Sequence, residues 1–171
     1  KEVVDKIIHG STTGKSLIDE FKTISLLNID IRGFSGIARK IGPQKSVALL
    51  NYFFSIMGGI VFKHNGIVDK YLGDGFLALF GAPVSTAADA DNALAAALEM
   101  QQAITAINES YAAKRLQEPF AIGISVYTGE GVVGNIGFEM KMDYTVIGDT
   151  VNNVFRLQDV TKPMPNSIVI S

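Results

Sequence analysis

The pattern of apolar and polar positions predicts three strands in the first half of the chain. Residues 24–30 form an apolar run typical of a buried strand. Residues 67–72 and 76–80 are two further β-favouring runs, and the tight turn Gly73-Asp74-Gly75 joins them as a hairpin. A helical connection from the first strand to residues 67–72 would make those two strands parallel. Residues 76–80 can then lie between them and run antiparallel to both.

Helical spacing predicts two helices before the hairpin. A short helix is expected at 34–41, and Pro43 opens a second one at its first turn. The apolar face of the second helix consists of Val47, Leu50, Phe54, Met57 and Val61. We interpret the run at 47–62 as a core helix, because it contains Asn, Ser and two Gly positions and falls short of a bilayer span.

The second half again alternates helix and strand. We expect a long amphipathic helix at 89–114, a strand at 120–126 and a turn at 129–131 that leads into a strand at 132–136. Residues 141–147 are an extended segment or a loop, 148–150 are expected to cap a helix at 151–160, and a last strand starts at 168. This order predicts an α+β fold with a ferredoxin-like βαββαβ core, a mostly antiparallel sheet, helices on one face and an added β hairpin or arm.

Composition indicates one globular domain. The 171 residues are 47% hydrophobic and 19% charged, which is unlike a disordered chain. Residues 1–22 are interpreted as a linker or the end of an upstream signalling helix, and residues 23–171 as the domain. The formal net charge of −2 gives no reason to expect a nucleic-acid partner, and without cysteine there is no disulfide or thiolate site. His9 and His64 are the only histidines, so a histidine-based hydrolytic triad has little support.

Two aspartates are the first candidate site. Asp30 ends the strand at 24–30, and Asp74 occupies the tip of the hairpin turn. The expected strand order brings these two carboxylates together. Because no cationic side chain is expected beside them, their convergence would be costly unless a cation joined them, and this indicates Mg²⁺. A solvated turn aspartate is the alternative interpretation of Asp74 alone.

The last helix carries a second candidate pair. Asn152 and Arg156 are four residues apart and project from the same face. Such a pair commonly lies on a solvent-exposed face of a helix and has no further role. Arginine nevertheless suits a bidentate grip on phosphate, and asparagine can bridge a ribose oxygen.

Four blocks of the sequence, in order, resemble the catalytic domain of class III nucleotidyl cyclases, the adenylate and guanylate cyclase family. The blocks are residues 27–35, 70–81, 131–137 and 144–157. The resemblance implies that Asp30, Ile31 and Asp74 hold two Mg²⁺ ions, for which Mn²⁺ can substitute. It also implies that the backbone of Ile31, Arg32, Gly33 and Phe34 cradles phosphate oxygens, that Asn152 positions the ribose, and that Arg156 stabilises charge on the α-phosphate.

Lys70 and Thr145 match the base-reading pair of the family, in the form found in a bacterial-type subgroup. Lysine can only donate a hydrogen bond, whereas a threonine hydroxyl can accept one. Adenine offers an acceptor at N1 and a donor at its amino group, and guanine reverses both, so the pair favours ATP. The alternative interpretations without a functional role are a solvated lysine and an ordinary β-forming threonine.

The resemblance therefore implies an adenylate cyclase that makes cyclic AMP and pyrophosphate from ATP. It implies a head-to-tail homodimer in which each site takes its aspartates from one subunit and Lys70, Thr145, Asn152 and Arg156 from the other. A cytoplasmic location and an upstream regulatory domain, in a protein that can be membrane-attached, are further expectations. A phosphate-binding lysine of the family is expected beyond Ser171. A guanylate cyclase, a diguanylate cyclase and a catalytically silent nucleotide-binding domain are the alternatives, of which the diguanylate cyclase lacks the Asn152 and Arg156 pattern.

Overall fold

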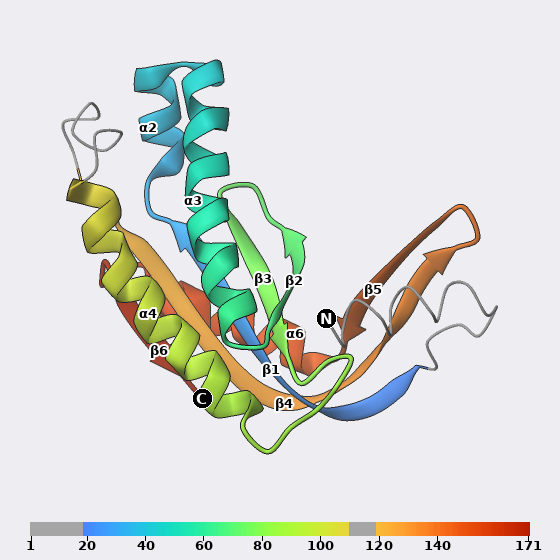
Figure 1. Ribbon diagram of the computed structural model, residues 1–171. Coiled ribbons are helices and arrows are strands. Elements are labelled where there is room, and N and C mark those ends of the chain that lie inside the picture. Colours follow the sequence, from blue (N-terminus) through green and yellow to red (C-terminus); the bar gives the residue numbers. More distant parts are fainter. Residues whose placement is uncertain (1–18, 110–118) are drawn as a thin grey trace.

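The computed structural model describes residues 19–109 and 119–171 (Figure 1). Its elements in chain order are β1 (Glu20–Ile31), α2 (Phe34–Ile41), α3 (Pro43–Lys63), β2 (Ile67–Tyr71), β3 (Gly75–Phe80), α4 (Asp89–Glu109), β4 (Ile122–Phe138), β5 (Lys141–Ile147), α6 (Asp149–Val160) and β6 (Ser167–Ile170). The expected linker at 1–22 falls largely outside the described residues, as does the expected end of the long helix at 110–114. The strand β1 begins at Glu20, before the expected domain start at residue 23.

The sheet has the order β2-β3-β1-β4-β5, and β6 pairs with the start of β4. The strand β3 lies between β2 and β1 and is antiparallel to both, so the predicted arrangement of the hairpin is confirmed. Only the pairing of β4 with β6 is parallel among the strand pairs of the described residues. The predicted α+β class with a mostly antiparallel sheet is confirmed.

Helices cover both faces of the sheet, which differs from the expectation of one face. The larger core lies between the sheet and the helices α3 and α4, and it includes Phe53, Met57 and Met100. The smaller core lies on the other face, where Val154 of α6 packs against Leu26 and Leu77 (Figure 1). Because side chains alternate along a strand, β1 and β3 supply apolar residues to both cores.

The helix α3 is a core helix, and its buried face matches the predicted one only in part. Met57 and Val61 are buried, as predicted. Leu49 and Phe53 are also buried, whereas Val47 is 58% exposed. Apolar residues occur all round this helix, so spacing alone could not fix its orientation. The helix begins at Pro43, as predicted, and has 21 residues. Within the described residues it is the one helix that meets the length and composition of a membrane span, and part of its apolar surface packs in the larger core.

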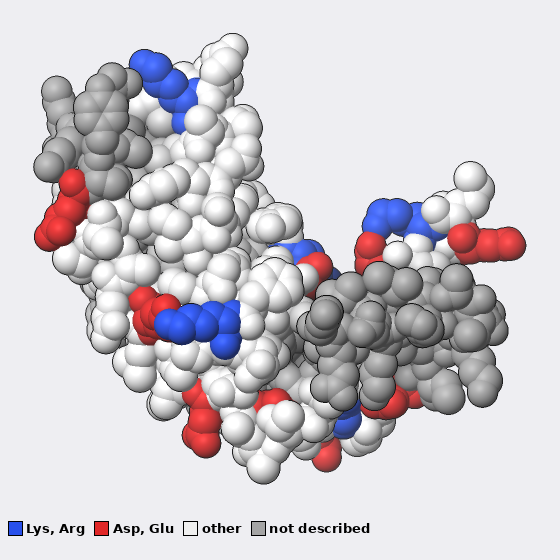
Figure 2. All heavy atoms as spheres, viewed as in Figure 1, with Lys and Arg blue, Asp and Glu red and all other residues white. Residues whose placement is uncertain are grey.

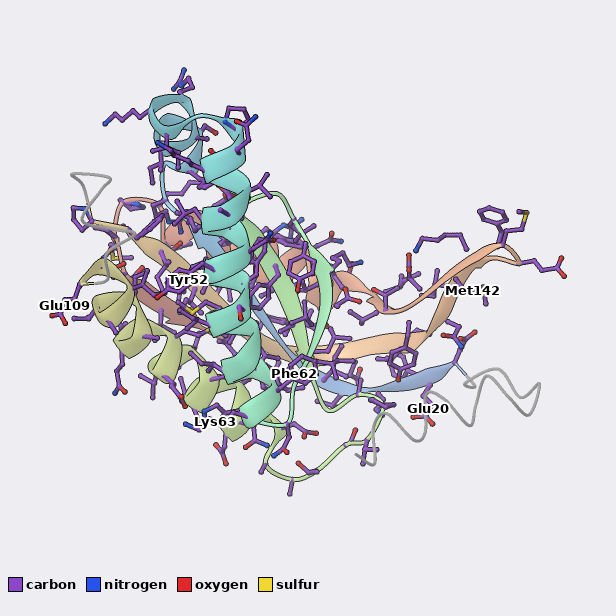
Figure 3. The ribbon with its side chains drawn as sticks, turned by 45° about the horizontal axis from the view of Figure 1, so that its top comes forward. Glu20, Tyr52, Phe62, Lys63, Glu109 and Met142 are labelled. Carbon is purple, nitrogen blue, oxygen red and sulfur yellow. The ribbon has the colours of Figure 1, made fainter. Side chains whose placement is uncertain are left out.

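The expected turn at 129–131 is wrong, because β4 continues through it as one strand of 17 residues. The first part of β4 pairs with β1 as far as Val133, and the last part pairs with β5. A Cβ atom on Gly129 would lie 2.6 Å from the hydroxyl of Thr150, so this glycine makes room for the start of α6. The end of β4 and β5 form an arm that projects from the body, with Met142 on it (Figure 3).

The predicted cap of α6 is also different. The helix begins at Asp149 with Gly148 as its N-cap, and no side chain caps it. The Thr150 hydroxyl instead donates a hydrogen bond to the carbonyl of Glu130, at 2.6 Å. This contact ties the start of α6 to β4.

Candidate active site

The turn between β2 and β3 brings Asp74 to the end of β1. Asp30 lies opposite Gly75 in the register of β1 against β3. The N–H of Ile31 donates to the Asp74 carbonyl at 3.2 Å, and the N–H of Leu72 donates to the Gly75 carbonyl at 2.8 Å. A Cβ atom on Gly75 would overlap the Ile29 carbonyl, so the close approach requires glycine. The predicted meeting of Asp30 and Asp74 is confirmed as geometry.

The expectation that no cation lies beside this pair is wrong. An Arg32 guanidinium nitrogen lies 3.2 Å from Oδ1 of Asp30 and donates to Oδ2 at 3.3 Å. Asp30 is in the last two residues of β1, and Arg32 lies in the turn that follows directly, so the chain holds the two side chains close together. Glycine at position 123 leaves room for the guanidinium, because any Cβ there would overlap it. Arg32 therefore offsets part of the negative charge at this edge.

The two carboxylates still fit a divalent cation. Burial, the largest effect, raises the pKa of Asp74, and the charge of Asp30 adds to this rise, whereas the Asp74 backbone N–H and Arg32 lower it. Oδ1 of Asp30 is buried without a hydrogen-bond partner, because Arg32 donates to the other oxygen. In the described part of the chain no third acidic or histidine side chain joins them as a ligand group. Mg²⁺ characteristically uses one or two carboxylates together with substrate phosphates, so this small donor set suits it.

A pocket of about 420 Å³ opens beside the aspartates. It is lined by Asp30 and Asp74 and, from the helix α6, by Phe155 and Arg156. One chain thus places Arg156 in the same pocket as its own aspartates, although the sequence led us to expect Arg156 to serve the aspartates of a partner. Asn152 is exposed one turn earlier on α6 and does not line this pocket.

Fewer backbone N–H groups of Ile31–Phe34 are available to bind phosphate than predicted. The N–H of Ile31 donates to Asp74, and the N–H of Arg32 donates to the Ala121 carbonyl at 2.7 Å. The groups left for an anion are the N–H groups of Gly33 and Phe34, at the start of α2. Gly33 has a positive φ of 67° and no side chain caps the helix.

Lys70 and Thr145 come together although β2 and β5 are the two opposite edges of the main sheet path. The ammonium of Lys70 donates to the Thr145 hydroxyl at 3.0 Å. The same hydroxyl donates to Oδ2 of Asp69 at 3.0 Å, and Lys70 forms an ion pair with that oxygen at 3.2 Å. The structure thus brings the predicted base-reading pair together and adds Asp69 to it.

His64 is the C-cap residue of α3. Its Nε2 contacts Glu99 of α4 at 2.7 Å, and Lys63 donates to the same carboxylate at 2.8 Å. These contacts join the C-terminal end of α3 to the middle of α4, and none of the three residues lines the pocket. His9 lies outside the described residues.

Comparison with models of protein families identifies the family to which this domain belongs. The sequence model of the adenylate and guanylate cyclase catalytic domain matches residues 17–171. The chain belongs to this family. The match extends over nearly all of the sheet and helices described above, so the aspartate edge and the Lys70 and Thr145 contact lie within a nucleotidyl cyclase domain.

Named relatives of this cyclase domain include bacterial adenylate cyclases. It is 31% identical to adenylate cyclase 1 of Rhizobium meliloti over 86% of this chain and 22% of the relative. It is 33% identical to an adenylate cyclase of Anabaena cylindrica over 88% of this chain and 30% of the relative. The chain thus spans less than a third of the length of either protein.

Solved structures with this fold include both substrate types. The guanylyl cyclase Cya2 matches with a TM-score of 0.81 and 36% identity, over 90% of this chain and 76% of that one. The adenylyl cyclase CyaB from P. aeruginosa matches with a TM-score of 0.82 and 30% identity, over 90% and 78%. A bacterial light-regulated adenylyl cyclase matches with a TM-score of 0.82 and 27% identity, over 97% and 48%.

Sequence reasoning missed two side chains at these sites. A spacing of two residues was the signal that could have placed Arg32 beside Asp30, at the end of β1. Asp69 had no such signal. The pairing of β2 with β3 shifts register between Val68 and Lys70, so Asp69 lies in a bulge that its neighbours in the sequence do not reveal.

Proposed function

We propose that this cyclase domain converts ATP to 3′,5′-cyclic AMP and pyrophosphate. The observation that carries the proposal is the contact between Lys70 and Thr145, which presents a donor beside an acceptor. Adenine needs that combination at N1 and its amino group. The two named adenylate cyclases among the relatives support the same substrate.

Each residue has a role in this reaction. Asp30 and Asp74, with Ile31, would hold two Mg²⁺ ions, which supply neutralising charge for the triphosphate and make the ribose 3′-hydroxyl more acidic. Asn152 positions the ribose for in-line attack on the α-phosphate. Arg156 stabilises the negative charge that develops there, and the N–H groups of Gly33 and Phe34 bind phosphate oxygens. Positioning and electrostatics provide most of the catalysis.

A homodimer is part of the proposal. The α3 side chains of Tyr52 and Phe62 are 41% and 65% exposed. The surface over α3 is largely uncharged, and a hollow separates it from the arm formed by β4 and β5 (Figure 2). Met140 at the tip of the arm is 88% exposed. The uncharged surface over α3 and the exposed arm support docking of a second copy, head to tail, so that the arm of one covers the other.

A cytoplasmic location and an upstream regulatory domain complete the proposal. The chain spans 22% and 30% of the two named relatives, and ATP is an intracellular substrate. Regulation from a neighbouring domain would act through the placement of the two subunits. Nothing in the net charge of −2 favours nucleic acid.

The test is turnover by the full-length protein with Mg-ATP and, separately, Mg-GTP, and the same pair with Mn²⁺. We expect cyclic AMP, with kcat/KM for ATP at least about tenfold above that for GTP. Guanylate cyclase is the second candidate, because Cya2 is 36% identical. Cyclic GMP as the main product would establish that candidate instead. Nucleotide binding without any cyclic product would indicate a catalytically silent domain.

A further inference from the structure

The carboxylate of Asp69 has a role that neither the Lys70 and Thr145 pair nor the aspartate edge accounts for. Its side chain is 1% exposed, and its neighbour Lys70 is 43% exposed. The bulge in β2 lets both consecutive side chains reach Thr145, where a regular strand would send them to opposite faces. A buried carboxylate is kept only where specific contacts require it.

The carboxylate of Asp69 determines which hydrogen bonds the Thr145 hydroxyl can still form. A carboxylate only accepts, so the single proton of the Thr145 hydroxyl lies on the bond to Asp69, at 3.0 Å. Of the two lone pairs of the hydroxyl oxygen, one receives Lys70 at 3.0 Å. One lone pair remains, and Thr145 has no proton left to offer a ligand.

The same count applies to Lys70. Its ammonium carries three protons, of which one goes to Thr145, and the ammonium lies 3.2 Å from Oδ2 of Asp69 in an ion pair. A donor therefore remains for a ligand. The three side chains together present a donor and one acceptor, side by side, and this is the complement of the N1 and amino edge of adenine.

We propose that Asp69 determines purine specificity by holding the proton of Thr145, so that this hydroxyl is an obligate acceptor. The inference rests on the proposed function and deepens it. Without the carboxylate, the Thr145 hydroxyl can rotate and donate to the 6-oxygen of guanine or hypoxanthine. Asp69 is a positioning residue, because it acts on the base through Thr145.

The decisive variant is Asp69→Asn, which keeps the size of the side chain but can place an N–H toward Thr145. The hydroxyl proton is then free to turn toward the base. ATP and ITP are the best pair of probes, because inosine differs from adenosine only at the 6-position and N1. We expect the ratio of kcat/KM for ATP to that for ITP to fall about tenfold or more in Asp69→Asn. Asp69→Glu, which keeps an acceptor-only group, should retain more of the parent ratio.

Thr145→Val provides the matched control. It has no hydroxyl to orient, so adding Asp69→Asn to it should leave the ATP to ITP ratio where Thr145→Val alone sets it. A merely structural role would lower turnover of both nucleotides equally. An unchanged ratio in Asp69→Asn, or an equal shift in the presence and absence of the hydroxyl, would overturn the inference.

Equilibrium competition by the same two nucleotides separates this inference from the proposed function. The parent is expected to bind ATP more tightly than ITP, and Asp69→Asn is expected to lose that preference. A parent that produces no cyclic AMP but shows this binding pattern refutes the catalytic proposal and supports the role of Asp69. A parent that makes cyclic AMP but binds both nucleotides equally refutes the role of Asp69 alone.

Discussion

The guanidinium of Arg32 lies 3.2 Å from the carboxylate of Asp30, at the edge where Asp74 arrives from the hairpin turn. Arg32 and Asp30 side chains are only 17% and 28% exposed, so the pair is shielded from water. The two aspartates are thus unequal. Asp30 has a cationic partner, whereas burial and the charge of Asp30 act against an ionised Asp74, as its raised pKa indicates.

Asp30→Asn and Asp74→Asn should each remove cyclase turnover while the fold survives. Each change replaces a charged metal ligand with a neutral amide, so we expect kcat to fall at least about a hundredfold. Cyclic nucleotide production by the purified variants measures this, and circular dichroism checks the fold. Near-parental turnover in either variant would contradict the assignment of both aspartates to the metal site.

The same two variants should differ in stability. Asp30→Asn leaves the shielded Arg32 without its counter-charge, and we expect a loss of about 1–3 kcal/mol in the free energy of unfolding. Asp74→Asn removes a half-buried carboxylate next to another one, so its stability should be equal to the parent or higher. Urea unfolding without metal or nucleotide compares them. Equal losses in both variants would mean that Arg32 does not distinguish the two aspartates.

Gly75→Ala should damage both the hairpin and the active site. The added methyl group would overlap the backbone of Ile29 and Asp30, which cannot move away cheaply, so we expect a loss of about 1–3 kcal/mol and a strong fall in turnover. Gly59→Ala on α3 is the matched control, since a Cβ atom there has nothing within 4 Å. It should stabilise by about 0.5–1 kcal/mol through helix propensity. A harmless Gly75→Ala would show that the turn does not pack against β1.

Glu99 should make stability depend on pH. Its hydrogen bond from Lys63, and next that from His64, lower the pKa of Glu99 from the ordinary value of 4.5. A lowered pKa means that the carboxylate stabilises the fold above that value and that this contribution disappears as the pH falls below it. Glu99→Gln should therefore lower the melting temperature at about pH 7, and this effect should shrink as the pH is lowered below 4.5. Glu109→Gln, at the exposed end of the same helix, should have little effect over this pH range.

Mixing two inactive variants should restore activity if sites form between subunits. In a mixed dimer of Asp30→Asn and Arg156→Ala, one site is doubly damaged and the other is intact. Random pairing makes about half of the dimers mixed, so activity should return to roughly a quarter of the parent level. Dilution below the dimer dissociation constant should remove it again. No recovery despite proven subunit exchange would mean that Arg156 serves the aspartates of its own chain, with which it shares a pocket.

Local sequence patterns were sufficient to predict most helices and strands and the residues of the candidate site. The glycines around Asp74 and the apolar runs beside them specify a hairpin, and the crossover rule then allows β3 to lie between β1 and β2. That order was enough to bring Asp30 and Asp74 together, because it depends only on local pattern and chain handedness. The four sequence blocks were likewise sufficient to indicate the family that the comparison established.

The way in which distant elements meet depends on packing and could not be predicted from local patterns. The orientation of α3 depends on which of its many apolar positions the sheet and α4 cover, and the continuation of β4 through Gly129 and Gly131 depends on packing by Thr150 and Val146. The contact of Lys70 with Thr145 joins opposite edges of the sheet path, and Asp69 reaches it only through a bulge. Residue spacing along the chain does not predict the Lys70 contact or the placement of Asp69, because the twist of the sheet and the close approach of its edges are properties of the whole packed chain.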